Sequence, residues 1–156
     1  MKTQAEMELI MNLTYPGLQL LYRDANLRIA GSKYEPGMLL REPGFTDASP
    51  KGGGIVTSHR YAILSNRFRD VSDMEHGTNW GLCVIGSGAH FKVLDVHRAH
   101  GKTLITLLHL PEEHWRFFDE VSTNVDDLLV EYARNRFECS LGAAPIPDVN
   151  TPEWRS

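Results

Sequence analysis

The chain has 156 residues, of which 42% are hydrophobic and 23% charged, and its formal net charge is −4 at pH 7. These values are typical of a globular protein, so we predict a single globular domain over residues 1–156. A net negative chain is a poor general binder of nucleic acid or of acidic membranes. The sequence contains no apolar run long enough to span a bilayer and no secretory signal at its start, so we expect no membrane partner.

The two cysteines, Cys83 and Cys139, are too few for a disulfide framework. We predict that both are buried thiols in a reducing compartment, and therefore that the protein is cytoplasmic.

The first part of the chain contains one expected helix and one ambiguous segment. Residues 3–13 have apolar side chains at helical spacing, although the segment looks weakly capped. Residues 18–30 fit either a helix or two short strands. We favour a helix that ends near Gly31, because five apolar positions fit one helical face and glycine commonly ends helices.

Turn-forming residues dominate the segment 33–54, which includes Pro36-Gly37, Pro43-Gly44 and the triglycine 52–54. We predict a turn-rich loop region with one short strand at 38–40 and a mobile surface loop at 45–54. Further strands are expected at 55–57 and 61–65. The pattern at Ser72 and Glu75 is that of a capping box and predicts a helical turn that stops at Gly77.

Three apolar runs separated by glycine-containing turns lie between Trp80 and Leu110, a pattern typical of an antiparallel meander. In the second hairpin, a bulged loop at Gly101 would pair Arg98 with Lys102 and Val93 with Leu107. Both faces of that hairpin are apolar near the middle, so we expect it to be central and covered on both sides.

The clearest helix begins at Asn124 and ends near Phe137, since its apolar residues form one stripe. A preceding helical turn from Pro111, carrying Trp115 and Phe118, is also expected. Residues 143–156 contain several prolines and are predicted to form an extended tail.

We therefore predict an α+β fold, with an antiparallel sheet of about five strands and the C-terminal amphipathic helix packed on one face. The alternative is a partly closed β-barrel capped by that helix.

The sequence contains no motif that identifies a reaction. Asp95 and His97 project from the same side of one expected strand and are the candidate catalytic pair of a small hydrolase or other acid–base enzyme. The histidines are too dispersed to converge on one ion, and Gly86-Ser87-Gly88 lacks the rest of a dinucleotide fingerprint. We therefore predict no metal site and no cofactor.

The segment 51–69 is unusual because it carries four basic residues and no acidic one. We predict a ligand-binding surface formed by His59, Arg60, Arg67 and Arg69 that accepts an anionic small molecule or an acidic protein surface. The alternative is that these cations pair with the acidic C-terminal half. On this basis a non-enzymatic binding module is preferred to the hydrolase. Nucleic acid is not expected as a partner, and a homo-oligomer stays open.

Overall fold

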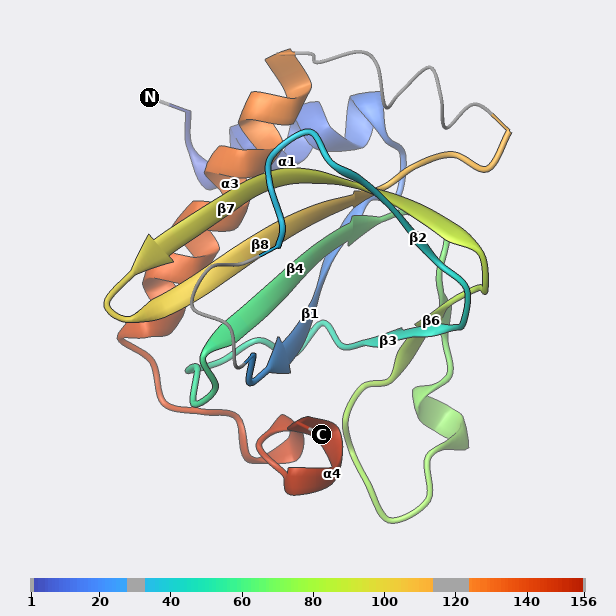
Figure 1. The fold of residues 1–156 in the computed structure, drawn as a ribbon, viewed down its shortest axis with the longest axis vertical. Helices are drawn as coiled ribbons and strands as arrows, with labels where there is room; N and C mark the ends of the chain where they lie inside the picture. The colour runs from blue at the N-terminus through green and yellow to red at the C-terminus, as the bar shows by residue number, and fades with distance from the viewer. Residues whose placement is uncertain (1, 28–32, 114–123, 156) are drawn as a thin grey trace.

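The computed structural model describes residues 2–27, 33–113 and 124–155 (Figure 1). The helices and strands occur in this order: α1 (Gln4–Thr14), β1 (Gln19–Ala25), β2 (Leu39–Glu42), β3 (Thr46–Ala48), β4 (His59–Ser65), β5 (Arg69–Asp70), η1 (Ser72–Met74), β6 (Cys83–Ile85), β7 (Ala89–Ala99), β8 (Lys102–His109), α3 (Asn124–Leu141), η2 (Pro147–Val149) and α4 (Pro152–Arg155).

Two sheets organise these elements. The larger has five strands in the order β1-β4-β8-β7-β2, and the smaller has three in the order β3-β6-β5. The α+β class and the five-stranded sheet are confirmed, but the sheet is mixed, because β4 runs parallel to β8. The chain leaves β4, builds part of the small sheet and β7, and only then returns as β8, so β4 and β8 are not a hairpin. Among the described strands the large sheet stays open between β1 and β2, so the barrel alternative is wrong.

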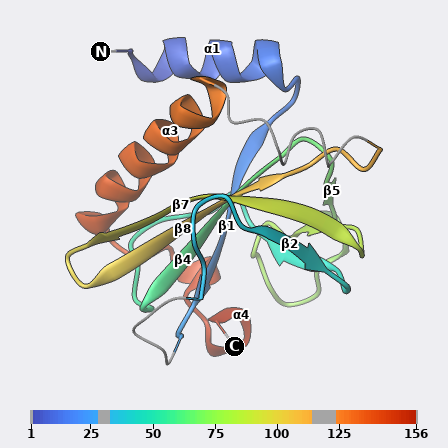
Figure 2. The same cartoon turned by 45° about the horizontal axis from the view of Figure 1, so that its top comes forward.

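The large sheet is covered on both faces. Helices α1 and α3 lie on one side and the small sheet on the other (Figure 2). Leu64, Leu108 and Leu129 belong to the apolar cluster beneath the helices. Ile63 and Ile105 belong to the cluster shared with Ile85 of the small sheet. Apolar residues on both faces of the β7–β8 hairpin therefore reflect two separate cores, as expected for a central hairpin.

The end of the predicted helix, from residue 28 to Gly31, lies outside the described residues. Residues 19–25 of the same segment form strand β1. It pairs antiparallel with β4 from Gln19 opposite Ser65 to Ala25 opposite His59. The apolar spacing suits both structures, and tertiary packing decides: as a strand the segment pairs with β4 along its whole length and buries Leu21 and Tyr22. Helix α1 is better capped than expected, since Thr3 and Glu6 form a complete capping box.

The β7–β8 hairpin differs from its predicted register near the turn. His100 and Gly101 both have positive φ, 53° and 76°, which defines a two-residue turn and pairs Ala99 with Lys102. An irregularity between Val93 and Asp95 then shifts the register by one residue. From Val93, opposite Leu107, the pairing is the predicted one.

Four other local predictions are wrong. Strand β6 pairs with β3 and β5, so it is not part of a meander with β7. Residues 55–57 form no strand, and Cys139 is exposed. The segment 45–54 is not a mobile loop, because it contains β3 and the fully buried Ser49. Gly52 lies against the ring of Tyr22, which leaves no room for a side chain.

The C-terminal region is packed rather than extended. Helix α3 continues to Leu141, and the tail after it carries η2 and α4. Val149 and Trp154 are 7% and 3% exposed, so the tail is anchored by two apolar side chains. The predicted turn with Trp115 and Phe118 lies outside the described residues.

Candidate functional site

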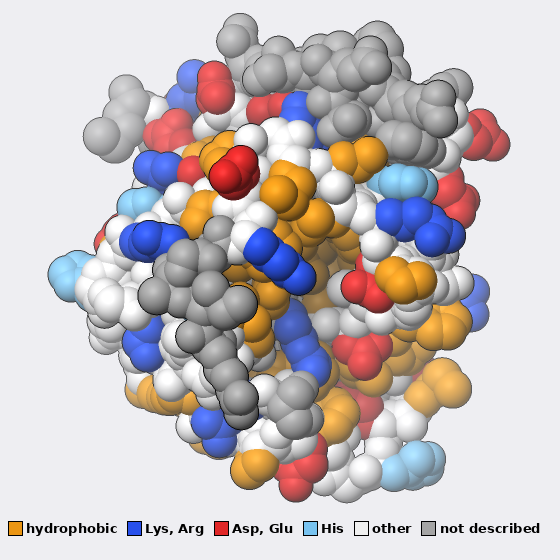
Figure 3. All heavy atoms as spheres, in the orientation of Figure 1, with side chains coloured by type: hydrophobic (Ala, Val, Ile, Leu, Met, Phe, Trp, Pro, Cys, Tyr) orange, Lys and Arg blue, Asp and Glu red, His pale blue; other side chains and the backbone are white. Residues whose placement is uncertain are grey.

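A cleft of about 410 Å³ opens on the large sheet, with Thr46 of β3 as the lining residue from the small sheet. Its apolar floor comes from the large sheet, through Tyr61 and Ile63 of β4, Phe91 of β7 and Leu107 of β8. The polar lining residues come from β1, β2, β3 and the segment before β2: Arg23, Lys33, Tyr34, Arg41, Glu42 and Thr46. Figure 3 looks onto a face that is hollowed where hydrophobic side chains meet Lys or Arg side chains.

The alternation of β1 explains why an arginine reaches this cleft. Side chains two residues apart on a strand share a face. Leu21 is fully buried in the core between the sheets, so Arg23 projects to the same side. Tyr61 lies directly opposite Arg23 in the β1–β4 pairing. Asp24 projects to the helix side, where it pairs with Arg60.

The cleft is electropositive, because Arg23, Lys33 and Arg41 line it with Glu42 as the one carboxylate among its lining residues. Burial lowers the pKa of the Arg23 guanidinium, and the negative charges of Asp47 and Asp24 oppose that shift. Arginine still remains charged at any physiological pH. Three cations around an apolar floor are suited to a ligand that joins negative groups to flat rings.

Two tyrosines form one wall. The hydroxyls of Tyr34 and Tyr61 lie 3.0 Å apart, and their rings meet edge to face with centroids separated by 5.8 Å. Burial raises the pKa of Tyr61, and the hydrogen bond to Tyr34 adds to that shift. Both effects keep Tyr61 neutral, so it can donate a hydrogen bond or pack against a ring without introducing negative charge.

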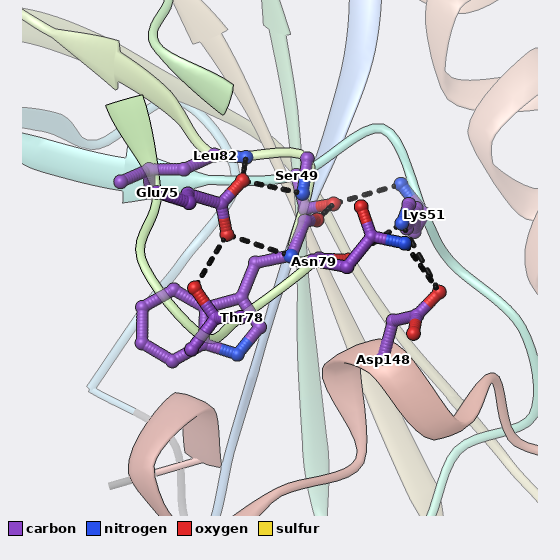
Figure 4. Close-up of polar contacts among 9 residues, drawn as sticks. Ser49, Lys51, Glu75, Thr78, Asn79, Leu82 and Asp148 are labelled. Carbon is purple, nitrogen blue, oxygen red and sulfur yellow. Dashed lines mark hydrogen bonds and ion pairs between the residues drawn. The ribbon is translucent and has the colours of Figure 1, made fainter. Parts of the chain in front are cut away.

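A dense hydrogen-bond network joins the segment after β3, the 75–82 loop and η2 (Figure 4). Ser49 Oγ donates to the Trp80 carbonyl at 2.5 Å and accepts from the Lys51 amide at 3.0 Å. The Glu75 carboxylate accepts from the amides of Trp80, Gly81 and Leu82 at 2.8, 3.1 and 3.2 Å.

The Glu75 carboxylate has a structural role in this network. Partial desolvation favours its protonated form, but the hydrogen bonds outweigh that effect and lower its pKa. Its oxygens are therefore used to fix the 75–82 loop. The predicted capping box is absent, since Ser72 bonds to Asp70 instead.

The four predicted ligand-binding residues occupy separate places. The Arg60 side chain is buried, and its guanidinium makes two hydrogen bonds to Asp24, at 2.7 and 2.9 Å. Arg67 follows the opposite end of β4 and donates to the Leu110 carbonyl. Arg69 is exposed on β5 of the small sheet. His59 is buried, and burial together with the charge of Arg98 lowers its pKa. Anion binding by these residues stays a prediction, and none of them lines the cleft.

Asp95 and His97 both face α3 and have different partners. Asp95 makes a two-pronged ion pair with Arg134 of α3, at 2.6 and 2.7 Å. His97 Nε2 lies 3.1 Å from a carboxylate oxygen of Glu138. The two contacts attach the helix to β7, which is the physical role that the geometry gives this pair.

Two further observations limit the chemistry. Across residues 2–27, 33–113 and 124–155, no three His, Cys, Asp or Glu side chains gather as metal ligands would. Within the same ranges, no helix combines the length and apolar character needed to cross a membrane.

The cleft residues were missed because the sequence around them was assigned to the wrong elements. Arg23 fell on a presumed helix, and Lys33, Arg41 and Glu42 fell in a presumed loop region. The available signal was the alternation of Leu21 and Arg23, which places an arginine beside a core position once the segment is taken as a strand.

Comparison with solved structures identifies the fold. The chain is similar to exoenzyme S from Pseudomonas aeruginosa, solved with human 14-3-3 protein beta and bound to Carba-NAD, with a TM-score of 0.52, 14% identity and coverage of 77% of this chain and 67% of that one. The catalytic domain of VahC from Aeromonas hydrophila has a TM-score of 0.51, 19% identity and 62% coverage of each chain. The ADP-ribosyltransferase Vis from Vibrio splendidus has a TM-score of 0.49 and 18% identity, with coverage of 63% of this chain and 51% of that one.

At identities this low, the likeness establishes a shared fold. The chain spans about half the length of Vis, 51%, and 62% of the VahC domain. No family model and no curated protein matches the sequence. The prediction of a non-enzymatic binding module is nevertheless contradicted, because the solved structures that share this fold include an exoenzyme and the catalytic domain of VahC.

Proposed function

We propose that the protein is an enzyme that binds NAD in the cleft on its large sheet and transfers or hydrolytically releases the ADP-ribose group. The observation that carries this proposal is the composition of the cleft, whose lining residues include three cations, one carboxylate and an apolar, aromatic floor. The shared fold with exoenzyme S, which was solved with Carba-NAD, supports the same reading.

The chemistry of NAD matches these side chains. Its two phosphates carry negative charge and suit the paired donors of arginine, so we assign them to Arg23, with Lys33 and Arg41 completing the electropositive rim. Its two flat rings suit the apolar and aromatic floor at Tyr61 and Phe91. The cavity of about 410 Å³ lies within the usual range for a small-molecule site.

The reaction breaks the bond between the ribose C1′ and the nicotinamide nitrogen, and the bonding electrons leave with nicotinamide. An acceptor, either water or a nucleophilic side chain of another protein, supplies the electron pair of the new bond to C1′ and then loses a proton. Positive charge develops on the ribose as nicotinamide departs, and a nearby carboxylate stabilises it. We assign that role to Glu42, whose Oε1 atom accepts a hydrogen bond of 3.2 Å from the Gly44 amide.

The test measures nicotinamide release from NAD, with affinity measured separately by calorimetry. Glu42→Gln keeps the shape of the side chain and removes its charge, and we expect it to lower the turnover rate roughly 10²- to 10³-fold with little change in affinity. Arg23→Ala should weaken NAD binding instead. Glu131→Gln, which alters an exposed carboxylate on α3, is the matched control and should behave as wild type. A wild-type protein that neither binds NAD nor releases nicotinamide would refute the proposal.

A further inference from the structure

Arg23 does not stand alone at the cleft wall, because the C-terminal helix packs an indole against it. The guanidinium carbon of Arg23 lies 4.5 Å from the centroid of the Trp154 ring. Trp154 in turn meets Trp80, with ring centroids 5.1 Å apart and planes inclined by 43°. Three segments that are distant in sequence thus meet in one cation–aromatic cluster: β1, the loop before β6, and α4.

The position of Trp154 does not depend on Arg23 alone. Its side chain is 3% exposed, and its amide donates to Thr151 Oγ1 at 3.3 Å. The tail that carries it is tied down at Asp148, whose Oδ2 atom lies 3.1 Å from Lys51 Nζ and accepts from Asn79 at 3.4 Å (Figure 4). The indole is therefore a fixed surface against which the flexible arginine side chain rests.

The face of an aromatic ring attracts a cation placed over it. The contact with Trp154 therefore restricts how the Arg23 side chain can turn. Asp47, whose negative charge raises the pKa of Arg23, is a competing attraction on the small sheet. A guanidinium released from Trp154 could turn toward that carboxylate.

We propose that Trp154 is a positioning residue of the cleft, which holds the Arg23 guanidinium in the orientation that binds the phosphates of the dinucleotide. The inference rests on the proposed function, since it concerns the ligand of the same cleft. It also gives the C-terminal segment a role in binding, although α4 contributes no residue to the cleft lining.

The test is a double-mutant cycle on the full chain, with dissociation constants measured by calorimetry for NAD, for ADP-ribose and for nicotinamide riboside, which lacks phosphate. A stacked cation and aromatic ring is worth a factor of about 3 to 30 in affinity. We expect Trp154→Ala to weaken NAD and ADP-ribose by the same factor within that range and to leave any binding of nicotinamide riboside unchanged. Trp154→Phe, which keeps a ring, should recover most of the loss. Arg155→Ala on the same helix is the control and should bind as wild type.

The cycle separates positioning from a general structural effect. In the Arg23→Ala background, Trp154→Ala should cause no further loss, because the group that it positions is gone. An equal loss in that background overturns the inference, and so does tighter binding by Trp154→Ala, which would mean that the indole occupies the place of the ligand. The melting curve of Trp154→Ala reveals any folding defect. In that case, the NAD affinity of Trp154→Phe is compared with that of the wild type instead.

A second readout distinguishes this inference from the function on which it rests. The Nε–H resonance of Arg23, followed by NMR in the free protein, should shift in Trp154→Ala because the ring current of the indole is lost. An unchanged resonance refutes the contact whether or not NAD binds. A wild-type protein that binds neither NAD nor ADP-ribose, but shows the shift, refutes the proposed function and with it the role of Trp154 in binding.

Discussion

Arg60 shows what burial does to a charged residue in this protein. Its side chain is 2% exposed, and its guanidinium bonds to both carboxylate oxygens of Asp24 and to the Gly52 carbonyl. The Tyr22 ring lies 5.1 Å from its central carbon. Removal of one partner from such a pair leaves the other charge buried and unpaired, which is costlier than the loss of an exposed ion pair.

We predict that Arg60→Ala lowers the free energy of unfolding by about 3–5 kcal/mol, measured by urea denaturation, because Asp24 loses its buried counter-charge. Arg69→Ala is the matched control, since Arg69 is exposed on β5, and its effect should stay within about 0.5 kcal/mol. A loss below about 1 kcal/mol for Arg60→Ala would show that Asp24 finds other partners or water.

His109 provides a prediction about pH. Its Nδ1 atom lies 2.7 Å from Ser65 Oγ, and burial, assisted by the charge of Arg67, lowers its pKa from 6.5 to about 4. The unfolded chain therefore takes up a proton on this histidine at a higher pH than the folded protein does. The contribution of His109 to stability is complete above about pH 6.5 and is lost as the pH falls from 6.5 to 4.

We expect the unfolding free energy of the wild type to fall over that pH interval more steeply than that of His109→Gln, which cannot titrate. The carboxylates and His59, whose pKa is also lowered, contribute equally to the pH dependence of both proteins. The difference between the two profiles therefore reports on His109. Denaturation at a series of pH values measures the difference, and an NMR titration of His109 checks the pKa directly. Parallel pH profiles for the two proteins would contradict the prediction.

At the scale of single elements, the β7–β8 turn illustrates how two residues fix a register. A two-residue turn with positive φ at both positions matches the twist of the strands that it joins. Gly101 adopts φ 76° without penalty, whereas His100 adopts φ 53° at some cost, because its Cβ crowds the backbone there.

We predict that Gly101→Ala lowers the unfolding free energy by about 1–2 kcal/mol, since alanine disfavours positive φ, and that His100→Asn raises it, because asparagine tolerates that conformation better. Gly86→Ala is a suitable control, as its φ lies outside the positive region and an added Cβ meets no atom within 4 Å. Thermal or urea unfolding measures all three variants. Equal effects of Gly101→Ala and Gly86→Ala would show that the positive φ is not what matters.

At the scale of the whole molecule, stability should be graded from the large sheet to the small one. Strand β8 is central, bonded to β4 on one side and to β7 on the other, and Leu104, Ile105 and Leu108 on it are at most 1% exposed. The small sheet contains strands of only two or three residues. Short strands with few buried contacts open more easily.

We therefore predict that, in native-state hydrogen exchange, the β8 amides open with a free energy close to that of global unfolding. The β6 amides should exchange through openings of lower free energy. Because β3 contributes Thr46 to the cleft wall, opening of the small sheet would also alter the cleft. Equal protection of β6 and β8 would mean that the two sheets unfold as a single unit.

By itself, the sequence determined the elements whose patterns are strong and local. The apolar stripe predicted α3, the apolar runs of β7 and β8 predicted a central hairpin, and the α+β class followed from them. These predictions succeed because side-chain periodicity and turn chemistry depend on neighbouring residues. The basic segment at 51–69 was also evident in the sequence. Clustering of basic residues along the chain, however, does not determine whether their side chains lie together in the folded protein.

Only the tertiary structure decided β1, the small sheet and the cleft. The segment 18–30 fits helix and strand alike, and pairing with β4, more than thirty residues away in the register of Tyr22 with Ala62, selects the strand. That selection places Arg23 opposite Tyr61 and beside Trp154, so that residues from both ends of the chain meet behind the cleft lining. Such a site arises from long-range pairing and packing, and no local pattern in the sequence encodes which distant partners are chosen.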